Sequence, residues 1–311
     1  TRVSMDEYEK EDVRDFALWK AAKPEDEEAG AAWDSPWGRG RPGWHLECSV
    51  MSTTELGETL DIHLGGEDLI FPHHEDEIAQ SEGATGRPFV RYWVHVKHLR
   101  LEGQKMSKSL GNTVSVGDLV TRGYEAAAIR HQLLTAQYRK ELNFTMDGLE
   151  ASSRAVQRLL DFEARLSEAQ VSGEASPSRI RELADTGIQR FREGMEDDLN
   201  SAEGLAALFV FVNEANAELD RVGPTLRPED RKDGLEALRS MDEVLGILEL
   251  ARDARRVDET TEGWIEEQIR LRKEARAARD FATADRIRDE LADRGVVLED
   301  SAEGTRWKKV K

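Results

Sequence analysis

Chemically reactive side chains are concentrated in residues 42–109 of this chain, and that concentration limits the folds open to it. The segment holds the only cysteine, six of the seven histidines and a lysine- and serine-rich string near its end. Cysteine, histidine and acidic side chains are the ligands that zinc accepts, and lysines between glycines suit the binding of phosphates. The fold must therefore hold metal-type and phosphate-type groups within a stretch of about seventy residues.

Cys48, His73 and Glu77 form the candidate metal site. Pro72 suits the first turn of a helix, where its missing N–H costs nothing, so the helix expected there carries His73 and Glu77 four residues apart on one face. A cysteine thiolate from an earlier segment completes three zinc donors and leaves one position for a fourth ligand or a substrate. Each residue taken singly has a plainer explanation, as a small buried thiol or a histidine at a helix terminus.

A glycine pair, Gly65 and Gly66, follows an alternating apolar segment and precedes Glu67 and Asp68. At such a turn the backbone can approach a nucleotide closely, and a carboxylate can hold ribose hydroxyls. Glycine pairs mostly make ordinary turns, so this string alone is weak evidence.

The string at residues 105–109, Lys-Met-Ser-Lys-Ser, is more specific. It places two ammonium groups and two hydroxyls between Gly103 and Gly111. This arrangement favours a clamp for the phosphates of a nucleoside triphosphate over a solvated surface turn.

Together these segments resemble the cysteinyl-tRNA synthetases, a family of class I aminoacyl-tRNA synthetases. The likeness rests on residues 43–48, 61–68, 71–77 and 105–109 and continues to Trp307, so it covers essentially the whole chain. It implies an α/β, Rossmann-like nucleotide-binding catalytic part, then an α-helical bundle and a small mixed α/β C-terminal module. It also implies ATP-dependent activation of L-cysteine to cysteinyl-adenylate and transfer to the 3′ end of tRNA(Cys).

The resemblance implies one zinc ion per chain, with Cys48, His73 and Glu77 as three of the family's four ligands. The fourth ligand in the family is a cysteine nearer the N-terminus, and this chain has no such residue. The HIGH-type motif that contacts ATP in the family is also absent. Because the chain starts at Thr1, we expect it to be the C-terminal part of a longer enzyme and to be inactive alone.

By the same resemblance, Trp44 and His63 line the amino-acid pocket, where zinc selects the thiol of cysteine over the hydroxyl of serine. His95 is expected to be structural or to support this site. Two positions depart from the family pattern, since Leu64 stands where a glycine is frequent and Asp76 where asparagine is frequent.

For ATP, the resemblance implies that Gly66 and Asp68 meet the ribose and that Lys105 and Lys108 stabilise the triphosphate as pyrophosphate leaves. Mg²⁺ is expected to accompany the nucleotide. The residues expected to bind ATP are Gly66, Asp68, Lys105, Met106, Ser107, Lys108 and Ser109.

Composition sets further bounds. At 311 residues the chain is long enough for several domains, and with 34% charged residues it contains no apolar run approaching about eighteen residues, so no membrane partner is expected. One cysteine excludes an internal disulfide framework and suits the reducing cytoplasm. The formal net charge of −19 requires any tRNA contact to rest on local basic surfaces. We expect a monomer.

The pattern along the chain predicts four parts. Residues 1–113 form the C-terminal half of the catalytic domain, in which 24–30 is a charged loop and Trp33 and Trp37 belong to an ordered loop packed over the core. Residues 114–146 are a helical connector, residues 147–250 carry the 3.6-residue apolar rhythm of a helical bundle, and residues 251–311 form a small terminal module. The resemblance assigns these three parts to contact with the tRNA stem, to tRNA binding and to anticodon recognition. Within the last part, 251–262 is predicted to be a charged linker.

Two other functions remain open. A ligase that joins cysteine to an amino sugar in thiol biosynthesis shares the zinc, glycine and lysine motifs, but it lacks a tail like residues 251–311. A zinc-containing RNA-binding fragment without catalysis is the third possibility. Cysteine-dependent ATP-pyrophosphate exchange and tRNA cysteinylation would separate the three.

Overall fold

The computed structural model describes residues 15–106, 111–256, 259–301 and 304–309. Its contacts divide the chain into two compact units, which comprise residues 1–98 with 138–141, and residues 99–137 with 142–311. No helix among the described residues is both long enough and apolar enough to cross a membrane. The four-part division predicted from the sequence stays a prediction.

The first unit is built on a parallel strand pair. Strands β3 (Leu60–Gly66) and β4 (Val90–Val96) pair in parallel, and the chain crosses between them through helix α3 (Glu75–Thr85). Parallel strands need such a crossover, and this β-α-β unit is the repeating piece of Rossmann-like folds. Helix α2 (Trp44–Leu56) packs against α3. The predicted α/β catalytic part is confirmed.

The turn into α3 differs in detail from the sequence-based prediction. The glycine pair ends β3 rather than forming a turn, and the turn itself is a 3-10 segment (Glu67–Leu69) followed by a kinked segment (Ile70–His74) in which the backbone of Phe71 is extended. The α-helix therefore begins at Glu75, three residues after Pro72. His73 and Glu77 nevertheless lie against each other, because the chain after the kink leads directly into α3.

The N-terminal hairpin corrects two predictions. Strands β1 (Trp19–Ala21) and β2 (Gly40–Pro42) pair antiparallel, and the predicted charged loop between them contains a short helix, α1 (Pro24–Glu28). Proline at the first helical position and a back-bond from Lys23 N–H to Asp26 favour that helix. The side chains of Trp33 and Trp37 are 52% and 75% exposed, so the prediction that they pack over the core was wrong.

The second unit opens with a three-stranded sheet in the order β6-β5-β7, which comprises Gln104–Lys105, Leu99–Leu101 and Leu142–Phe144. Helices α4 (Val116–Thr121) and α5 (Ala126–Leu134) lie between β6 and β7 in the chain. Ser115 caps α4 in a reciprocal capping box with Asp118.

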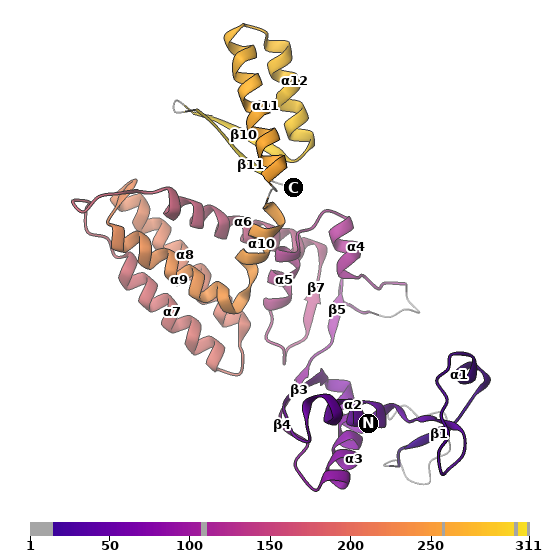
Figure 1. Ribbon diagram of the computed structural model, residues 1–311. Coiled ribbons are helices and arrows are strands. Elements are labelled where there is room, and N and C mark those ends of the chain that lie inside the picture. The colour runs from indigo at the N-terminus through magenta and orange to yellow at the C-terminus, as the bar shows by residue number, and fades with distance from the viewer. Residues whose placement is uncertain (1–14, 107–110, 257–258, 302–303, 310–311) are drawn as a thin grey trace. The chain divides into compact units, whose positions relative to one another are not determined.

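A bundle of long helices follows and confirms the helical prediction for this region. Its helices are α6 (Met146–Glu168), α7 (Ile180–Glu196), α8 (Ser201–Val222), α9 (Pro228–Leu245) and α10 (Ile247–Arg255). A short parallel pair, β8 (Gln170–Val171) and β9 (Thr225–Leu226), ties the loops after α6 and α8. Figure 1 shows α7 lying beside α8 and α9. The core includes Leu159, Phe162, Phe211, Leu238 and Met241.

The C-terminal module consists of helices α11 (Glu259–Ala277) and α12 (Phe281–Asp293) and the hairpin β10 (Val296–Ser301) with β11 (Gly304–Lys309). Ile265, Ile287, Leu291 and Val296 form its small core. The predicted mixed α/β module is confirmed. The prediction of a charged linker at 251–262 is wrong for most of that range, because α10 continues to Arg255 and α11 begins at Glu259.

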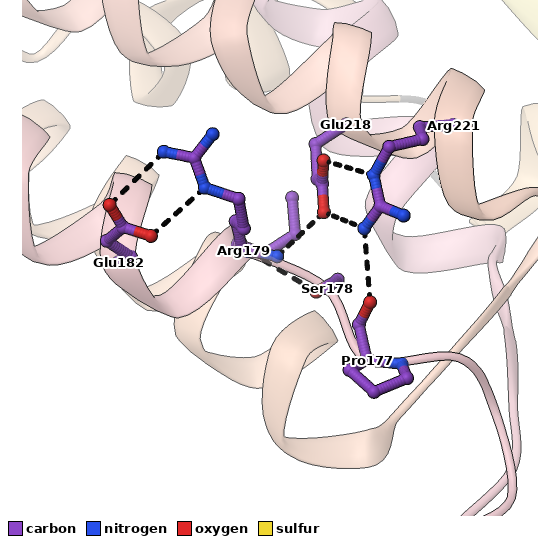
Figure 2. A network of polar contacts seen from close by, with 7 residues as sticks. Pro177, Ser178, Arg179, Glu182, Glu218 and Arg221 are labelled. Carbon is purple, nitrogen blue, oxygen red and sulfur yellow. Dashed lines mark hydrogen bonds and ion pairs between the residues drawn. The ribbon is translucent and has the colours of Figure 1, made fainter.

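A buried carboxylate joins α8 to the start of α7, as Figure 2 shows. Glu218 accepts hydrogen bonds from the backbone N–H of Arg179 at 2.8 Å and from two guanidinium nitrogens of Arg221 at 2.8 and 2.6 Å. Arg221 also donates to the carbonyl of Pro177. The hydrogen bonds from Arg221 outweigh the opposing effect of burial and, with the Arg179 N–H, lower the pKa of Glu218 to about 2.

We predict that Glu218→Gln lowers the free energy of unfolding by about 1.5 to 3 kcal/mol at pH 7, because it removes the charge from buried hydrogen bonds. The native pKa lies below the unfolded value, so this stabilisation is present above about pH 4.5 and disappears as pH falls towards 2. Urea titrations followed by circular dichroism at pH 7 and pH 3 measure both effects.

Glu182→Gln is the matched control. Glu182 makes two hydrogen bonds to the guanidinium of Arg179 in the same view, but both side chains are exposed to solvent, so its loss should lower stability much less than the loss of Glu218. Equal effects of the two substitutions would contradict the role assigned to Glu218.

Candidate metal centre

Helix α2 positions Cys48 and Trp44, which lie one turn apart. The helix begins after Gly43, whose N–H donates to the carbonyl of Leu18 at 2.9 Å. A Cβ at this position would lie 1.8 Å from the carbonyl oxygen of Ala17, so only glycine lets the two segments cross this closely. The glycine therefore fixes where α2 starts, and with it where the thiol of Cys48 lies.

Strands β3 and β4 position the aromatic wall of the site. Their register pairs His63 with Trp93, and the two rings stack with centroids 4.7 Å apart. His95 follows two residues later on the same face of β4. Residue 63 is thus held by a strand and an aromatic ring rather than by a flexible loop.

The three donors predicted from the sequence come together. One ligand atom each of Cys48, His73 and Glu77 lies within 4.8 Å of the others. Nε2 of His73 is 2.7 Å from Oε1 of Glu77, and the side chain of Glu77 is 0% exposed. Within the described residues, neither oxygen of that carboxylate has a donor in hydrogen-bonding geometry. A fully buried carboxylate needs positive charge beside it, which either a protonated imidazole or a metal ion can supply.

The electrostatics of the cluster point the same way. Burial, followed by the nearby carboxylate of Glu77, raises the pKa of the Cys48 thiol to about 11. Burial also opposes ionisation of Glu77, but contact with His73 and the neighbouring imidazoles outweigh it and hold the pKa of Glu77 below its usual value. The thiolate and the carboxylate therefore disfavour each other, and a cation between them would remove the conflict.

A chain of buried contacts supports His73 from behind. Nδ1 of His73 lies 2.6 Å from Nδ1 of His45, and Nε2 of His45 lies 3.2 Å from Oδ2 of Asp76. The negative charge of Asp76 favours a proton on Nε2 of His45, and Nδ1 of His45 then accepts the proton of His73 Nδ1. The lone pair of His73 Nε2 then faces Glu77. A histidine that ligates a metal through Nε2 must be in this tautomer, with its proton on Nδ1.

The sequence analysis gave no role to His45 or His74 and noted Asp76 only as a departure from a family pattern. His45 stands next to Trp44 in a string already singled out, and His74 is next to a predicted ligand, so adjacency was the available signal. Adjacency cannot tell which histidine faces the ligands, because that depends on the backbone turn at residues 70–74.

The indole of Trp44 covers the metal cluster on one side. Its ring stacks on His73 with centroids 4.3 Å apart, and 53% of its surface remains exposed. Nε2 of His63 lies 3.5 Å from Oε2 of Glu77, so the two residues assigned to the amino-acid pocket both touch the cluster. Within the cluster His73 and Glu77 are buried, whereas Cys48 is half-buried and Trp44 is exposed.

The residues assigned to ATP lie in both units. In the first unit Gly66 ends β3, and Asp68 follows in the 3-10 turn with its carboxylate 3.6 Å from Nε2 of His98. In the second unit Lys105 ends β6, and its carbonyl accepts from the amide of Asn112 at 3.1 Å, which closes the base of the loop. Met106 packs against the neighbouring core. Ser107, Lys108 and Ser109 lie outside the described residues.

Comparison with known protein families identifies three regions. Residues 1–154 match the model of the class I (C) tRNA synthetase catalytic domain, residues 190–250 match the DALR domain, and residues 265–307 match the cysteinyl-tRNA ligase anticodon binding domain.

Curated relatives cover the chain almost completely. The cysteine-tRNA ligase of Solibacter usitatus is 47% identical over 99% of this chain and 64% of its own length. Those of Koribacter versatilis and Symbiobacterium thermophilum are 42% and 45% identical over 99% of this chain, and 66% and 64% of their own lengths are covered. The chain thus spans somewhat less than two thirds of these relatives.

One solved structure supports the fold. A ternary complex of Agrobacterium radiobacter K84 LeuRS with tRNA and LeuAMS aligns with 74% of this chain and 34% of that chain, with a TM-score of 0.50 and 16% sequence identity. Because the sequence models follow one another along the chain and the relatives share 42 to 47% of its residues, this chain belongs to the cysteine-tRNA ligase family of class I aminoacyl-tRNA synthetases.

Proposed function

We propose that this chain works as part of a cysteine-tRNA ligase, which uses ATP to activate L-cysteine and then transfers the cysteine to tRNA(Cys). The set of Cys48, His73 and Glu77, in which the histidine and the carboxylate are buried, is the single observation that carries the proposal. A thiolate, an imidazole and a carboxylate suit zinc, and three protein ligands leave room for a substrate atom. The zinc ion itself is part of the proposal.

Cys48, His73 and Glu77 would hold the zinc. The chemistry that zinc supplies when bound is ligation of the substrate sulfur with a lowered thiol pKa, which favours cysteine over serine. Trp44 excludes water from one side of the substrate, and His63, fixed by its stack on Trp93, orients it. A pocket that relied on shape alone would discriminate by only about 1 to 3 kcal/mol for so small a difference.

The nucleotide completes the reaction. The carboxylate of cysteine attacks the α-phosphorus of ATP, the bond to the β-phosphate breaks, and pyrophosphate leaves with Mg²⁺. Gly66 and Asp68 hold the ribose, while Lys105 and Lys108 neutralise the departing phosphates. A terminal ribose hydroxyl of the tRNA then attacks the cysteinyl-adenylate, and AMP leaves.

The partner is tRNA(Cys), and the C-terminal module is the feature that favours it. The match of residues 265–307 to an anticodon binding domain supports tRNA over an amino sugar as the acceptor. Cysteinylation of tRNA by the complete reading frame tests this choice. Cysteine-dependent ATP-pyrophosphate exchange separates the ligase from a non-catalytic RNA-binding fragment. The single cysteine further supports a cytoplasmic protein, which we propose acts as a monomer.

We predict that Glu77→Gln and Cys48→Ser in the complete reading frame abolish zinc binding and lower kcat/KM for cysteine at least about 100-fold. Without the metal, the sulfur of cysteine loses the ligand that binds it. Discrimination against serine then depends on pocket shape alone, which gives about 10- to 200-fold. Metal analysis and ATP-pyrophosphate exchange with cysteine and serine measure these effects. Glu75→Gln, an exposed carboxylate two residues away on α3, is the matched control and should leave both unchanged. Full zinc content in Glu77→Gln would refute the ligand assignment.

We predict that Asp76→Ala weakens zinc affinity about 10- to 100-fold, because His45 loses the acceptor that sets the tautomer of His73. Asp76→Asn keeps a carbonyl acceptor and should stay within about threefold of the parent affinity, well short of the loss expected for alanine. Competition with a chelator of known affinity measures both variants. If asparagine and alanine weaken zinc equally, the hydrogen-bond chain does not act through Asp76.

We predict that Lys105→Ala lowers the rate of pyrophosphate exchange about 100-fold, as the loss of one group that stabilises transition-state charge does in other enzymes. Zinc content should not change. Lys232→Ala removes an exposed lysine on α9 and serves as the control. A rate within twofold of the parent for Lys105→Ala would exclude Lys105 from the phosphate site.

A further inference from the structure

Glu77 lies between two sets of metal-type donors, and the proposed zinc site contains only one of these sets. Its Oε1 faces His73, while its Oε2 lies 3.5 Å from Nε2 of His63. One ligand atom each of His63, His74 and Glu77 lies within 4.8 Å of the others, as in the first set. The two sets share the carboxylate and no other residue.

The second set has the support expected of metal ligands. Nδ1 of His74 lies 2.8 Å from Nε2 of His95, so a proton on that nitrogen leaves the lone pair of His74 Nε2 for a cation. His74 is buried, and a Cβ on Gly65 would lie 2.7 Å from its Nε2, so the glycine makes room for the ring. The glycine pair thus has a use beside the one assigned to the nucleotide.

His63 supplies a second, independent observation. Its Nδ1 is buried and has no hydrogen-bond partner among the described residues. The ring is held by its stack on Trp93 and by an edge contact with His74, with centroids 5.0 Å apart. An imidazole fixed in place with one nitrogen unpartnered and the other facing a buried carboxylate is a favourable ligand for a borderline divalent ion.

We propose that His63, His74 and Glu77 form a second, weaker zinc site and that zinc bound there inhibits the enzyme. A carboxylate shared between the two sets would bridge ions about 3.5 to 4 Å apart, as in two-metal sites. The second site binds more weakly because it has no thiolate and lies next to a cation already in place.

The inhibitory part rests on the proposed function. His63 belongs to the pocket proposed for the amino acid, so an ion ligated by His63 competes with cysteine for the same space. When the second site is nine-tenths filled, the apparent KM for cysteine should rise about tenfold, because only the remaining tenth can bind substrate. The maximal rate at saturating cysteine should stay the same, since cysteine and the second ion exclude each other.

The test uses the complete reading frame at buffered free zinc. Native mass spectrometry should find one zinc per chain at low free zinc and two at higher free zinc. His74→Gln should keep the first ion and lose the second, and His63→Gln should do the same. Glu75→Gln, the exposed carboxylate on the same helix, should still bind two. Circular dichroism and retention of the first ion show that each variant is folded.

Inhibition is read as the ratio of KM for cysteine at high and low free zinc within each protein. Cysteine chelates zinc in solution, but this affects all variants equally, so the ratio should be about ten in the parent and about one in His74→Gln. A parent that never binds a second ion, or a His74→Gln variant that still does, overturns the site. Two ions without a change in KM overturn the inhibition. Absence of cysteine-dependent exchange with one ion bound overturns the proposed function instead, while the stoichiometry still decides the second site.

Discussion

The burial of one carboxylate, that of Glu77, is the constraint on which the candidate site depends. The side chain is 0% exposed, with a thiol on one side and imidazoles on the other. Burying an anion is unfavourable unless positive charge compensates it, and the imidazoles of this cluster supply only part of that charge. The surrounding elements act to hold this arrangement: α2 supplies the sulfur, the turn into α3 the histidine, and the parallel strands the aromatic wall.

Support for the cluster reaches one layer further out. The contacts from Asp76 through His45 to His73 select a tautomer, and the contact from His95 to His74 does the same for the second imidazole. Contacts of this kind fix the tautomer and the ring orientation of a histidine, and so decide where its donor nitrogen points. Asp76 thus stands where it can accept from His45, and an asparagine there could do the same through its carbonyl oxygen.

In the second unit, buried carboxylates that accept hydrogen bonds stabilise the contacts between helices. Glu218 is buried and accepts hydrogen bonds from Arg221 and from the backbone N–H of Arg179, so it fixes the start of α7 against the C-terminal part of α8. Asp242 is likewise buried and accepts from the backbone N–H groups of Ile247, Leu248 and Glu249, which caps α10. Buried acids at helix starts let a chain of net charge −19 pack long charged helices with little repulsion in the core.

The sequence by itself determined the types and order of the elements and the identity of three donors. Apolar periodicity predicted the bundle helices, and the spacing of His73 and Glu77 placed them one helical turn apart, because these signals depend on neighbours along the chain. It failed where distant contacts decide. The exposure of Trp33 and Trp37 depends on contacts distant in the sequence. The helices at 24–28, 247–255 and 259–277 were missed in their charged parts because charge was read as a sign of loops, although proline and Asp26 favour the first of them locally.

Only the tertiary structure decided which side chains meet. The parallel register of β3 and β4 brings His63 onto Trp93, and the kinked turn at 70–74 directs His73 to one side of Glu77 and His74 to the other. Neither the register nor that turn follows from residue spacing, since both depend on how the strands and α2 pack. For this reason the sequence could name the three donors of one cluster, whereas the residues that support them and the neighbouring donor set required the fold.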